Sequence, residues 1–141
     1  MFKSHKTEKN LHDKIYYTVI IINIDNIEWI IKNYGIEYTL NVCEKVFNVI
    51  KDYFSPNNDI KKIGESKFII KIEDTCYQHA KMIVSLITRT VMKNDYVLND
   101  INCDLKLSSG ISSGFDINTQ INIAYKNLYS SSSHKINCNH K

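Results

Sequence analysis

The segment from Tyr17 to Ile24, YTVIIINI, is the feature that most narrows the fold of this chain. It is β-branched and apolar on both of its alternating faces, which is typical of a central strand covered on both sides. Asn23 and Asp25 are two residues apart, so they share one face where the strand ends. Polar pairs in such a place are common ligand-binding or catalytic positions. The alternative is that Asp25 or Asn26 forms the N-cap of the following helix.

The segment from Asp59 to Ile72, DIKKIGESKFIIKI, predicts a β-hairpin. Apolar residues alternate through Phe68 and Ile70 after a turn at Gly64-Glu65-Ser66, and a glycine in a short loop is a hairpin signal. If this hairpin is central to the sheet, its tip is the natural place for an active site. The candidate positions at the tip are Gly64, Glu65, Ser66, Lys67 and Phe68.

Four helices and one more strand complete the expected fold. We expect helices over 26–33, 37–54, 77–92 and 118–129, and a strand over 104–112. The apolar stripe of the second helix is predicted to contain Leu40, Cys43, Phe47, Ile50 and Phe54, which step by three and four residues. The order is β-α-α-β-β-α-β-α, an α+β fold with helices packed on a mostly antiparallel sheet.

The chain is expected to hold one domain, over residues 15–130. Residues 1–14 have no apolar period and predict a polar arm. Residues 131–141 follow a four-serine run and predict a flexible tail. Gly110 within the expected fourth strand predicts a bulge or a close approach of another backbone.

Composition excludes several classes of function. A net charge of +3 does not indicate a nucleic-acid or membrane partner. No apolar run is long enough to span a bilayer, and the N-terminus has no signal peptide, so we expect a cytoplasmic protein. The four cysteines contain no C-x-x-C pair, which favours free thiols over a zinc site. His134, Cys138 and His140 are read as a chance grouping and not as a metal site.

Several landmarks, in this order, resemble one known family. The landmarks and the family patterns that they resemble are Val19–Gly35 for an apolar strand followed by D-x-D-x-F-K-x-x-N-D-x-x-G, Lys62–Phe68 for R-Y-G-G-D-E-F, Leu107–Ile111 for V-S-x-G-V, and Ala124 with Leu128 and Tyr129 for A-D-x-A-L-Y. The chain thus resembles a GGDEF domain, the family of diguanylate cyclases. That resemblance implies the palm-like fold shared with nucleotidyl cyclases and polymerases.

The resemblance also implies which positions would do the chemistry. In the family, two metal ions held by carboxylates activate a hydroxyl of GTP and clamp its phosphates. The two metal-binding carboxylates fall on Asn23 and Ser66, and the acidic fourth letter of the signature falls on Lys67. Guanine-reading positions fall on Ile31 and Leu40. The phosphate-binding lysine falls on Ser132.

All of these positions therefore carry a replaced residue, and the resemblance is to a degenerate GGDEF domain. An amide or a hydroxyl is a weaker ligand for Mg²⁺ than a carboxylate, and Lys67 adds a positive charge. Asp25 and Glu65 could serve as displaced ligands; the alternative is that Asp25 caps a helix and Glu65 is a solvated turn residue. The R-x-x-D product-inhibition motif corresponds to Ser55–Asp59, where Asp59 is one residue out of place and the arginine is missing, since Arg89 is the one arginine in the chain.

Two functions follow from this. The first is a catalytically inactive domain that regulates or binds proteins, as a homodimer or with a cyclase or phosphodiesterase, in cyclic-di-GMP signalling. It is expected to need no metal and no cofactor. The second is an atypical nucleotide-binding protein with weak turnover, which would use Mg²⁺ and GTP at Asp25 and Glu65. The lysines of the hairpin could attract a phosphate or an acidic partner, or they could be a solvated face.

Overall fold

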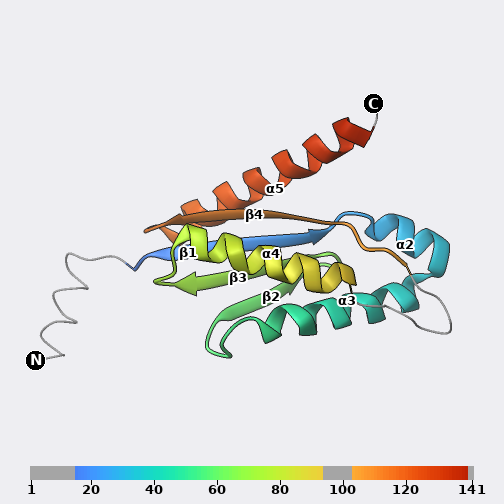
Figure 1. Cartoon of the computed structure of the whole chain (residues 1–141), viewed down its shortest axis with the longest axis horizontal. Helices are drawn as coiled ribbons and strands as arrows, with labels where there is room; N and C mark the ends of the chain where they lie inside the picture. The colour runs from blue at the N-terminus through green and yellow to red at the C-terminus, as the bar shows by residue number, and fades with distance from the viewer. Residues whose placement is uncertain (1–14, 94–102, 140–141) are drawn as a thin grey trace, which may run out of the picture.

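The computed structural model describes residues 15–93 and 103–139 (Figure 1). Its elements are β1 (Tyr17–Ile24), α2 (Ile27–Tyr34), α3 (Ile36–Asp52), β2 (Asp59–Ile63), β3 (Lys67–Glu73), α4 (Tyr77–Lys93), β4 (Leu107–Gly114) and α5 (Ile117–Asn139). The strands form one sheet in the order β2-β3-β1-β4, and all neighbouring pairs are antiparallel. This confirms the predicted α+β fold and its element order.

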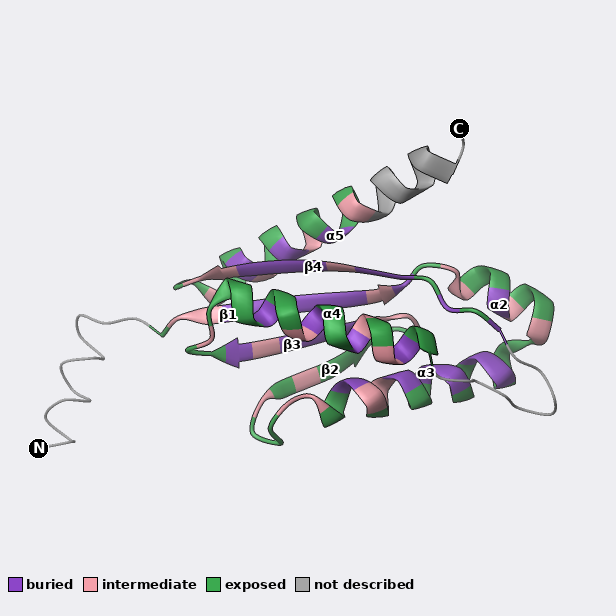
Figure 2. Ribbon diagram, in the orientation of Figure 1, coloured by how far each residue is buried: buried purple, intermediate pink, exposed green. Residues whose placement is uncertain are grey.

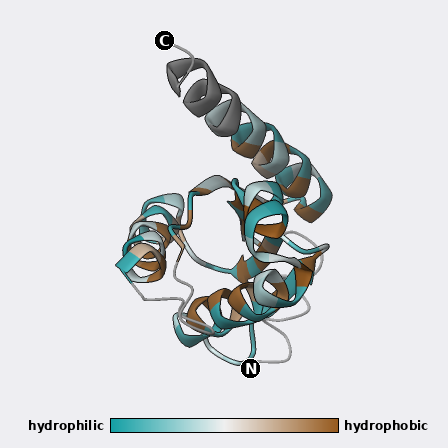
Figure 3. Ribbon diagram, turned by 90° about the vertical axis from the view of Figure 1, so that its right-hand side faces the viewer, coloured by the Kyte–Doolittle hydropathy of each residue, from teal (hydrophilic) through white to brown (hydrophobic). Residues whose placement is uncertain are grey.

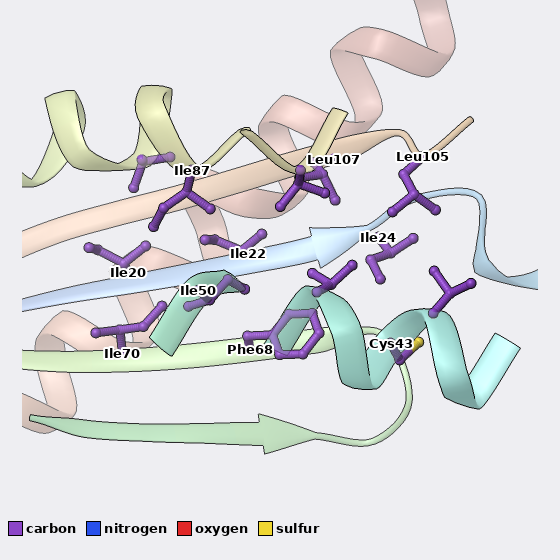
Figure 4. Close-up of a cluster of buried hydrophobic side chains, with 14 of the residues drawn as sticks. Ile20, Ile22, Ile24, Cys43, Ile50, Phe68, Ile70, Ile87, Leu105 and Leu107 are labelled. Atoms are coloured by element: carbon purple, nitrogen blue, oxygen red, sulfur yellow. The ribbon is translucent and has the colours of Figure 1, made fainter. Parts of the chain in front are cut away.

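Strand β1 is covered on both faces, as its apolar pattern predicts. Ile20, Ile22 and Ile24 point into the larger core, which α3 and α4 close (Figure 4). Val19 and Ile21 point the other way, where they pack with side chains of α5. Both sets are fully buried, so β1 lies at the centre of the fold (Figure 2).

The helices present their apolar sides to the sheet and their polar sides outward (Figure 3). The buried side of α4 consists of Ala80, Val84, Ile87 and Val91, which the sequence predicts. On the other face α5 packs mainly against β4 and β1. Of the helices that the structure describes, none is both long and apolar enough to span a bilayer.

The main chains of α5 and β4 approach each other closely at Gly110. A Cβ atom at this position would lie 2.5 Å from the backbone nitrogen of Leu128 and closer still to the carbonyl oxygen of Ala124. Real Cβ atoms do not come so near to backbone atoms, so only glycine fits here. The close backbone approach predicted from the sequence is confirmed.

The apolar stripe of α3 differs from the predicted one at Leu40. This side chain is 43% exposed, whereas Cys43 and Ile50 are buried as expected. The core position near the helix start is taken by Thr39, whose hydroxyl donates a hydrogen bond to the Gly35 carbonyl over 2.8 Å. Because its polar group is satisfied inside the helix, Thr39 can be buried in place of a larger apolar residue.

An active site at the hairpin tip was expected on the condition that the hairpin is central to the sheet, and the structure does not meet this condition. Strand β2 is an edge strand, and only β3 lies inside the sheet. Along β2 every residue except Ile60 is exposed. The local alternation of apolar residues predicts that the two strands pair, but it does not contain the order of strands across the sheet.

Two element ends also differ from the sequence-based expectation. Strand β4 covers Leu107–Gly114 where we expected 104–112. Helix α5 continues to Asn139, past the predicted end at Tyr129. No glycine or proline follows Tyr129, so the serine run contains no residue that ends a helix. The expected polar arm over residues 1–14 lies outside the described residues.

Candidate functional site

At one end of the sheet β1 ends and β3 and β4 begin (Figure 1). Polar side chains of these segments form hydrogen bonds with one another there. The Ser66 hydroxyl donates to Oδ1 of Asn23 over 3.0 Å. Nδ2 of Asn23 donates to Oδ1 of Asp25 over 2.7 Å, and the Ser108 hydroxyl donates to the same oxygen over 2.6 Å. We call Asn23, Asp25, Ser66 and Ser108 the strand-end cluster. The structure thus brings together Asn23, Asp25 and Ser66, which the sequence analysis selected.

Backbone hydrogen bonds hold the cluster in place. The amide of Ile24 donates to the Ser66 carbonyl over 2.9 Å, which ties the end of β1 to the hairpin turn. The amide of Asp25 donates to the Lys106 carbonyl over 2.7 Å, which ties β1 to the segment before β4. Bonds to both neighbours fix the direction in which Asn23 and Asp25 present their side chains.

Asn26 also ties the end of β1 to the segment before β4, and it does not cap α2. Its side-chain nitrogen donates to the Asp104 carbonyl over 2.9 Å, and its side-chain oxygen accepts from the Lys106 amide over 3.0 Å. Asn26 stands at the N-cap position of α2 but makes no side-chain cap bond there. The alternative that Asp25 or Asn26 caps the helix is therefore wrong, because Asn26 bonds to the segment before β4 and Asp25 accepts from Asn23 and Ser108.

The signature turn keeps its shape through its first and last residues. Gly64 has a φ of +62°, the left-handed region that favours glycine. Phe68 is fully buried and stacks on Phe47 of α3, with ring centroids 5.8 Å apart and planes 17° apart. Cys43 is buried in the same layer, behind the turn (Figure 4). Gly64 therefore sets the turn, and Phe68 anchors it in the core.

The residues between these two present mixed charge. Lys67 is directly opposite Asn23 in the β1–β3 register, so both side chains lie on the same face of the sheet. Glu65 is exposed at the turn, and Ser66 and Lys67 are partly buried. One carboxylate, Asp25, thus lies in the cluster with an amide and two hydroxyls, and a lysine stands on the neighbouring strand.

This donor set can be compared with what a divalent cation needs. Mg²⁺ is held by one or two carboxylates, together with water and substrate phosphates. In the part of the chain that the structure describes, no three His, Cys, Asp or Glu residues form a group that could hold a metal ion. Oδ1 of Asp25 already accepts two hydrogen bonds, from Asn23 and Ser108.

The remaining site positions from the sequence analysis lie on helices. Ile31 of α2 is partly buried, and Leu40 of α3 is exposed. Neither side chain carries a donor or an acceptor for a base. The side chains of Ser132, His134 and Cys138 lie outside the described residues, and so does His140. Asp59, in the stretch compared with the product-inhibition motif, forms an ion pair of 3.5 Å with Lys71.

Sequence reasoning missed Ser108 as a member of the cluster. The segment Leu107–Ile111 was recognised as a landmark strand, but its serines were not assigned a role. The signal was the alternation of that strand: with Gly110 facing α5, Ser108 faces the same way. Its partner in β1 could not be identified before the register Asn23 to Ser108 was known.

Comparison with known proteins shows what the chain is similar to. The family model described as "Diguanylate cyclase, GGDEF domain" matches residues 3–138. No curated protein sequence matches. The FimX GGDEF domain from Pseudomonas aeruginosa is 12% identical with a TM-score of 0.80, and the match covers 94% of this chain and 85% of that one.

Other solved structures agree. The active GGEEF domain of a diguanylate cyclase from Vibrio cholerae is 19% identical with a TM-score of 0.78, over 93% of this chain and 85% of that one. The GGDEF domain of DgcB from Caulobacter crescentus, in complex with c-di-GMP, is 15% identical with a TM-score of 0.79, over 94% and 83%. These likenesses show the fold. Because the family model matches almost the whole length, the chain belongs to the diguanylate cyclase GGDEF domain family.

Proposed function

We propose that this GGDEF domain is catalytically inactive and acts as a regulatory or protein-interaction module in cyclic-di-GMP signalling. The observation that carries the proposal is the strand-end cluster. At the positions where the family resemblance places metal-binding carboxylates, Asn23 and Ser66 are hydrogen-bonded to each other. The polar groups satisfy one another, so the site does not depend on a cation to be stable.

The cost of bringing a cation to this place supports the same proposal. Mg²⁺ gives up hydration water reluctantly, and carboxylates are what offset that loss. Here the single carboxylate of Asp25 is engaged by Asn23 and Ser108, and Lys67 adds a positive charge nearby. In the family, Mg²⁺ activates the GTP hydroxyl and neutralises phosphate charge. The residues present do not fit that role.

A protein partner fits the remaining features. One solved structure with the same fold is that of the diguanylate cyclase SiaD in complex with its activator SiaC from Pseudomonas aeruginosa, 12% identical with a TM-score of 0.79. This chain covers 52% of that one. A family member can therefore form a complex with a separate regulatory protein. We propose that the present domain acts likewise, with a protein partner or as a homodimer.

Calorimetry with nucleotides tests the proposal. GTP, ATP and cyclic di-GMP are titrated into the protein with Mg²⁺ or Mn²⁺, and release of pyrophosphate from GTP is followed separately. We expect neither metal-dependent binding nor turnover. Metal-dependent GTP binding that is lost in Asp25→Ala would overturn the proposal in favour of an atypical nucleotide-binding protein that uses Asp25 and Glu65.

Restoring the carboxylates provides the matched control. In the double variant Asn23→Asp/Ser66→Asp, the cluster contains three carboxylates, and we expect it to gain Mn²⁺ binding, measured by the loss of the free-ion electron paramagnetic resonance signal. The single variant Ser66→Ala keeps the same fold without an added ligand and should bind no Mn²⁺. If the original protein binds Mn²⁺ as well as the double variant does, the replaced residues are not what prevents metal binding.

A further inference from the structure

Among the described residues, β4 pairs with no strand on the side away from β1, and a groove follows this edge between α4 and α5. It consists of two hollows of about 380 Å³ each, and both are lined by Val84 and Ser85 of α4 and by Ser109 of β4. Ser131 of α5 contributes to one hollow and Asn127 to the other. Because the two hollows share these lining residues of α4 and β4, they are continuous, and we call them together the edge groove. Figure 1 shows β4 at the border of the sheet with these two helices on its two sides.

The direction of the backbone groups along β4 follows from the hydrogen bonds of β1. The amide of Ile24 points to the β3 side, and the amide of Asp25 points to the β4 side. Backbone groups alternate along a strand, so the other odd-numbered residues of β1 also point to β4. Their partners include Gly110, opposite Ile21. The neighbours of Gly110, namely Ser109 and Ile111, therefore turn their backbone groups away from β1 and into the edge groove.

One contact supports this assignment independently. Nδ2 of Asn127, on α5, donates to the Ile111 carbonyl over 2.9 Å. This carbonyl can be reached from α5 because it points outward from the sheet. The amides of Ser109 and Ile111 and the carbonyl of Ser109 have no backbone partner among the residues that the structure describes. The edge groove thus offers two donors and one acceptor in strand geometry.

The charges along the edge groove have one sign. Lys81 and Arg89 of α4 line it, and no aspartate or glutamate lines it among the described residues. They are eight residues apart on one helix, which spans about 12 Å. Four residues of an extended strand span about 13 Å, and residues four apart lie on the same face. Acidic side chains at that spacing would meet both cations.

From these observations we propose that the edge groove binds an extended acidic segment of a partner protein, which adds to the sheet beside β4. Backbone hydrogen bonds to Ser109 and Ile111 hold the segment, and its carboxylates meet Lys81 and Arg89. The inference rests on the proposed function, because it names the surface through which an inactive domain would bind its partner. A second copy of this domain fits less well as the partner, since α4 and α5 flank the β4 edge in each copy and would keep the two β4 strands apart.

Amide exchange with a defined probe tests the inference. The probe is a nine-residue peptide of alternating threonine and valine in which two residues four positions apart are glutamate. At saturating peptide, we expect exchange of the Ser109 and Ile111 amides to slow at least about tenfold, because buried strand hydrogen bonds protect amides from water. The amides of Ile60 and Lys62, at the free edge of β2, are the matched control and should be unchanged.

Variants separate strand addition from simple attraction of charge. Ser109→Pro removes an outward-facing amide and leaves the pairing with β1 intact, so it should abolish peptide binding, whereas Ser109→Ala should preserve it. Arg89→Gln should weaken binding about threefold to fivefold, as expected for an exposed ion pair. A peptide methylated on its backbone nitrogens replaces the Ser109→Pro test if circular dichroism shows that this variant is unfolded.

Three results would overturn the inference. The first is equal binding of the methylated and unmethylated peptides, and the second is protection confined to Ile60 and Lys62. The third is protection of Ser109 that rises with protein concentration in the absence of peptide, which would identify a second copy as the occupant. Turnover of GTP is measured on the same sample. If GTP is turned over and the peptide still protects the Ser109 and Ile111 amides, only the proposed inactivity is contradicted. If there is neither turnover nor protection, only the proposal for the edge groove is contradicted.

Discussion

The two edges of the sheet are protected in different ways. Strand β2 is exposed along most of its length, and its charged side chains are those of Asp59, Lys61 and Lys62. Strand β4 carries no charge and is largely buried. Charged residues on an open edge discourage pairing with other chains, and covering elements do the same for an uncharged edge. The comparison shows that the β2 edge discourages additional strands by its charged side chains, while the helices beside β4 restrict access at that edge to a segment that fits between them.

The largest effect is expected from Gly110, on the sheltered edge. Gly110→Ala places a methyl group against the backbone of Ala124 and Leu128, so α5 must shift, and we expect a loss of about 3 kcal/mol in the free energy of unfolding. On the open edge, Lys61→Ala should change it by less than about 0.5 kcal/mol. Urea denaturation of both variants measures the difference. Similar values for the two would show that the edges are equally tolerant.

The next effect concerns Cys43, which lies behind the open edge and is nonetheless buried. Burial raises the pKa of this thiol to about 11, and the nearby charges of Lys62 and Glu65 act in opposite directions. The folded protein keeps the proton where the unfolded chain releases it. Stability is therefore complete below the unfolded pKa and falls as pH rises toward the folded one, by about 2 kcal/mol between pH 8 and pH 10.

Denaturation at a series of pH values up to 10 checks this expectation. The variant Cys43→Ala should lose most of the pH dependence over this range. Burial also raises the pKa of Tyr38, but the ordinary pKa of tyrosine is about 10, so this group contributes only at the upper end of the range. If the free energy of unfolding depends on pH in the same way in Cys43→Ala, the Cys43 thiol is not shielded from water, and solvent reaches the core behind β2.

The strand-end cluster reaches from the hairpin to β4, and its two serines allow the contribution of each side to stability to be measured separately. Ser108→Ala removes a hydrogen bond on the β4 side, where the side chain is only 5% exposed. Ser66→Ala removes one on the β2 side, at a partly buried position. We expect losses of about 1.5 and about 1 kcal/mol, since a more deeply buried partner is left less accessible to water. Thermal unfolding of both variants gives the order, and a reversed order would contradict the assigned burial.

The smallest effect is expected for the ion pair of Lys71 with Asp59, which lies on the open half. Both side chains are partly exposed, so Lys71→Ala should cost less than about 0.5 kcal/mol. That small difference should disappear in 1 M salt, where charges at the surface are screened. A larger or salt-independent loss would show that Lys71 contributes mainly through packing of its aliphatic part.

The fold could be predicted from sequence where local patterns decide it. The apolar residues of β1 and α4 repeat with the period of their element, and a glycine marks the hairpin turn, so those elements were found. Strand order is decided by pairing between distant segments, which is why the sequence left open whether the hairpin is central and could not assign β2 to the edge. The prediction that Leu40 is buried was wrong because Thr39, whose hydroxyl is hydrogen-bonded within the helix, takes the buried position at that turn of α3.

The candidate site could be predicted only in part, for a similar reason. Asn23 and Asp25 are neighbours in sequence, so their shared face follows from strand geometry alone. Ser108 joins them through the register of β4, which depends on how β4 aligns with β1 along their length. Asn26 looked like a cap because its position before α2 is known from sequence, whereas its partners at Asp104 and Lys106 are distant.

The contact at Gly110 has a consequence for the side of the edge groove that α5 forms. Because main-chain atoms of β4 and α5 meet there, the distance between the strand and this helix is set by atoms that every residue has. Substitutions among the α5 side chains that face the groove can change the chemistry of this side without moving α5 toward β4. The position of one wall is therefore fixed by main-chain contact, while the side chains that a partner touches on it are free to differ between related domains.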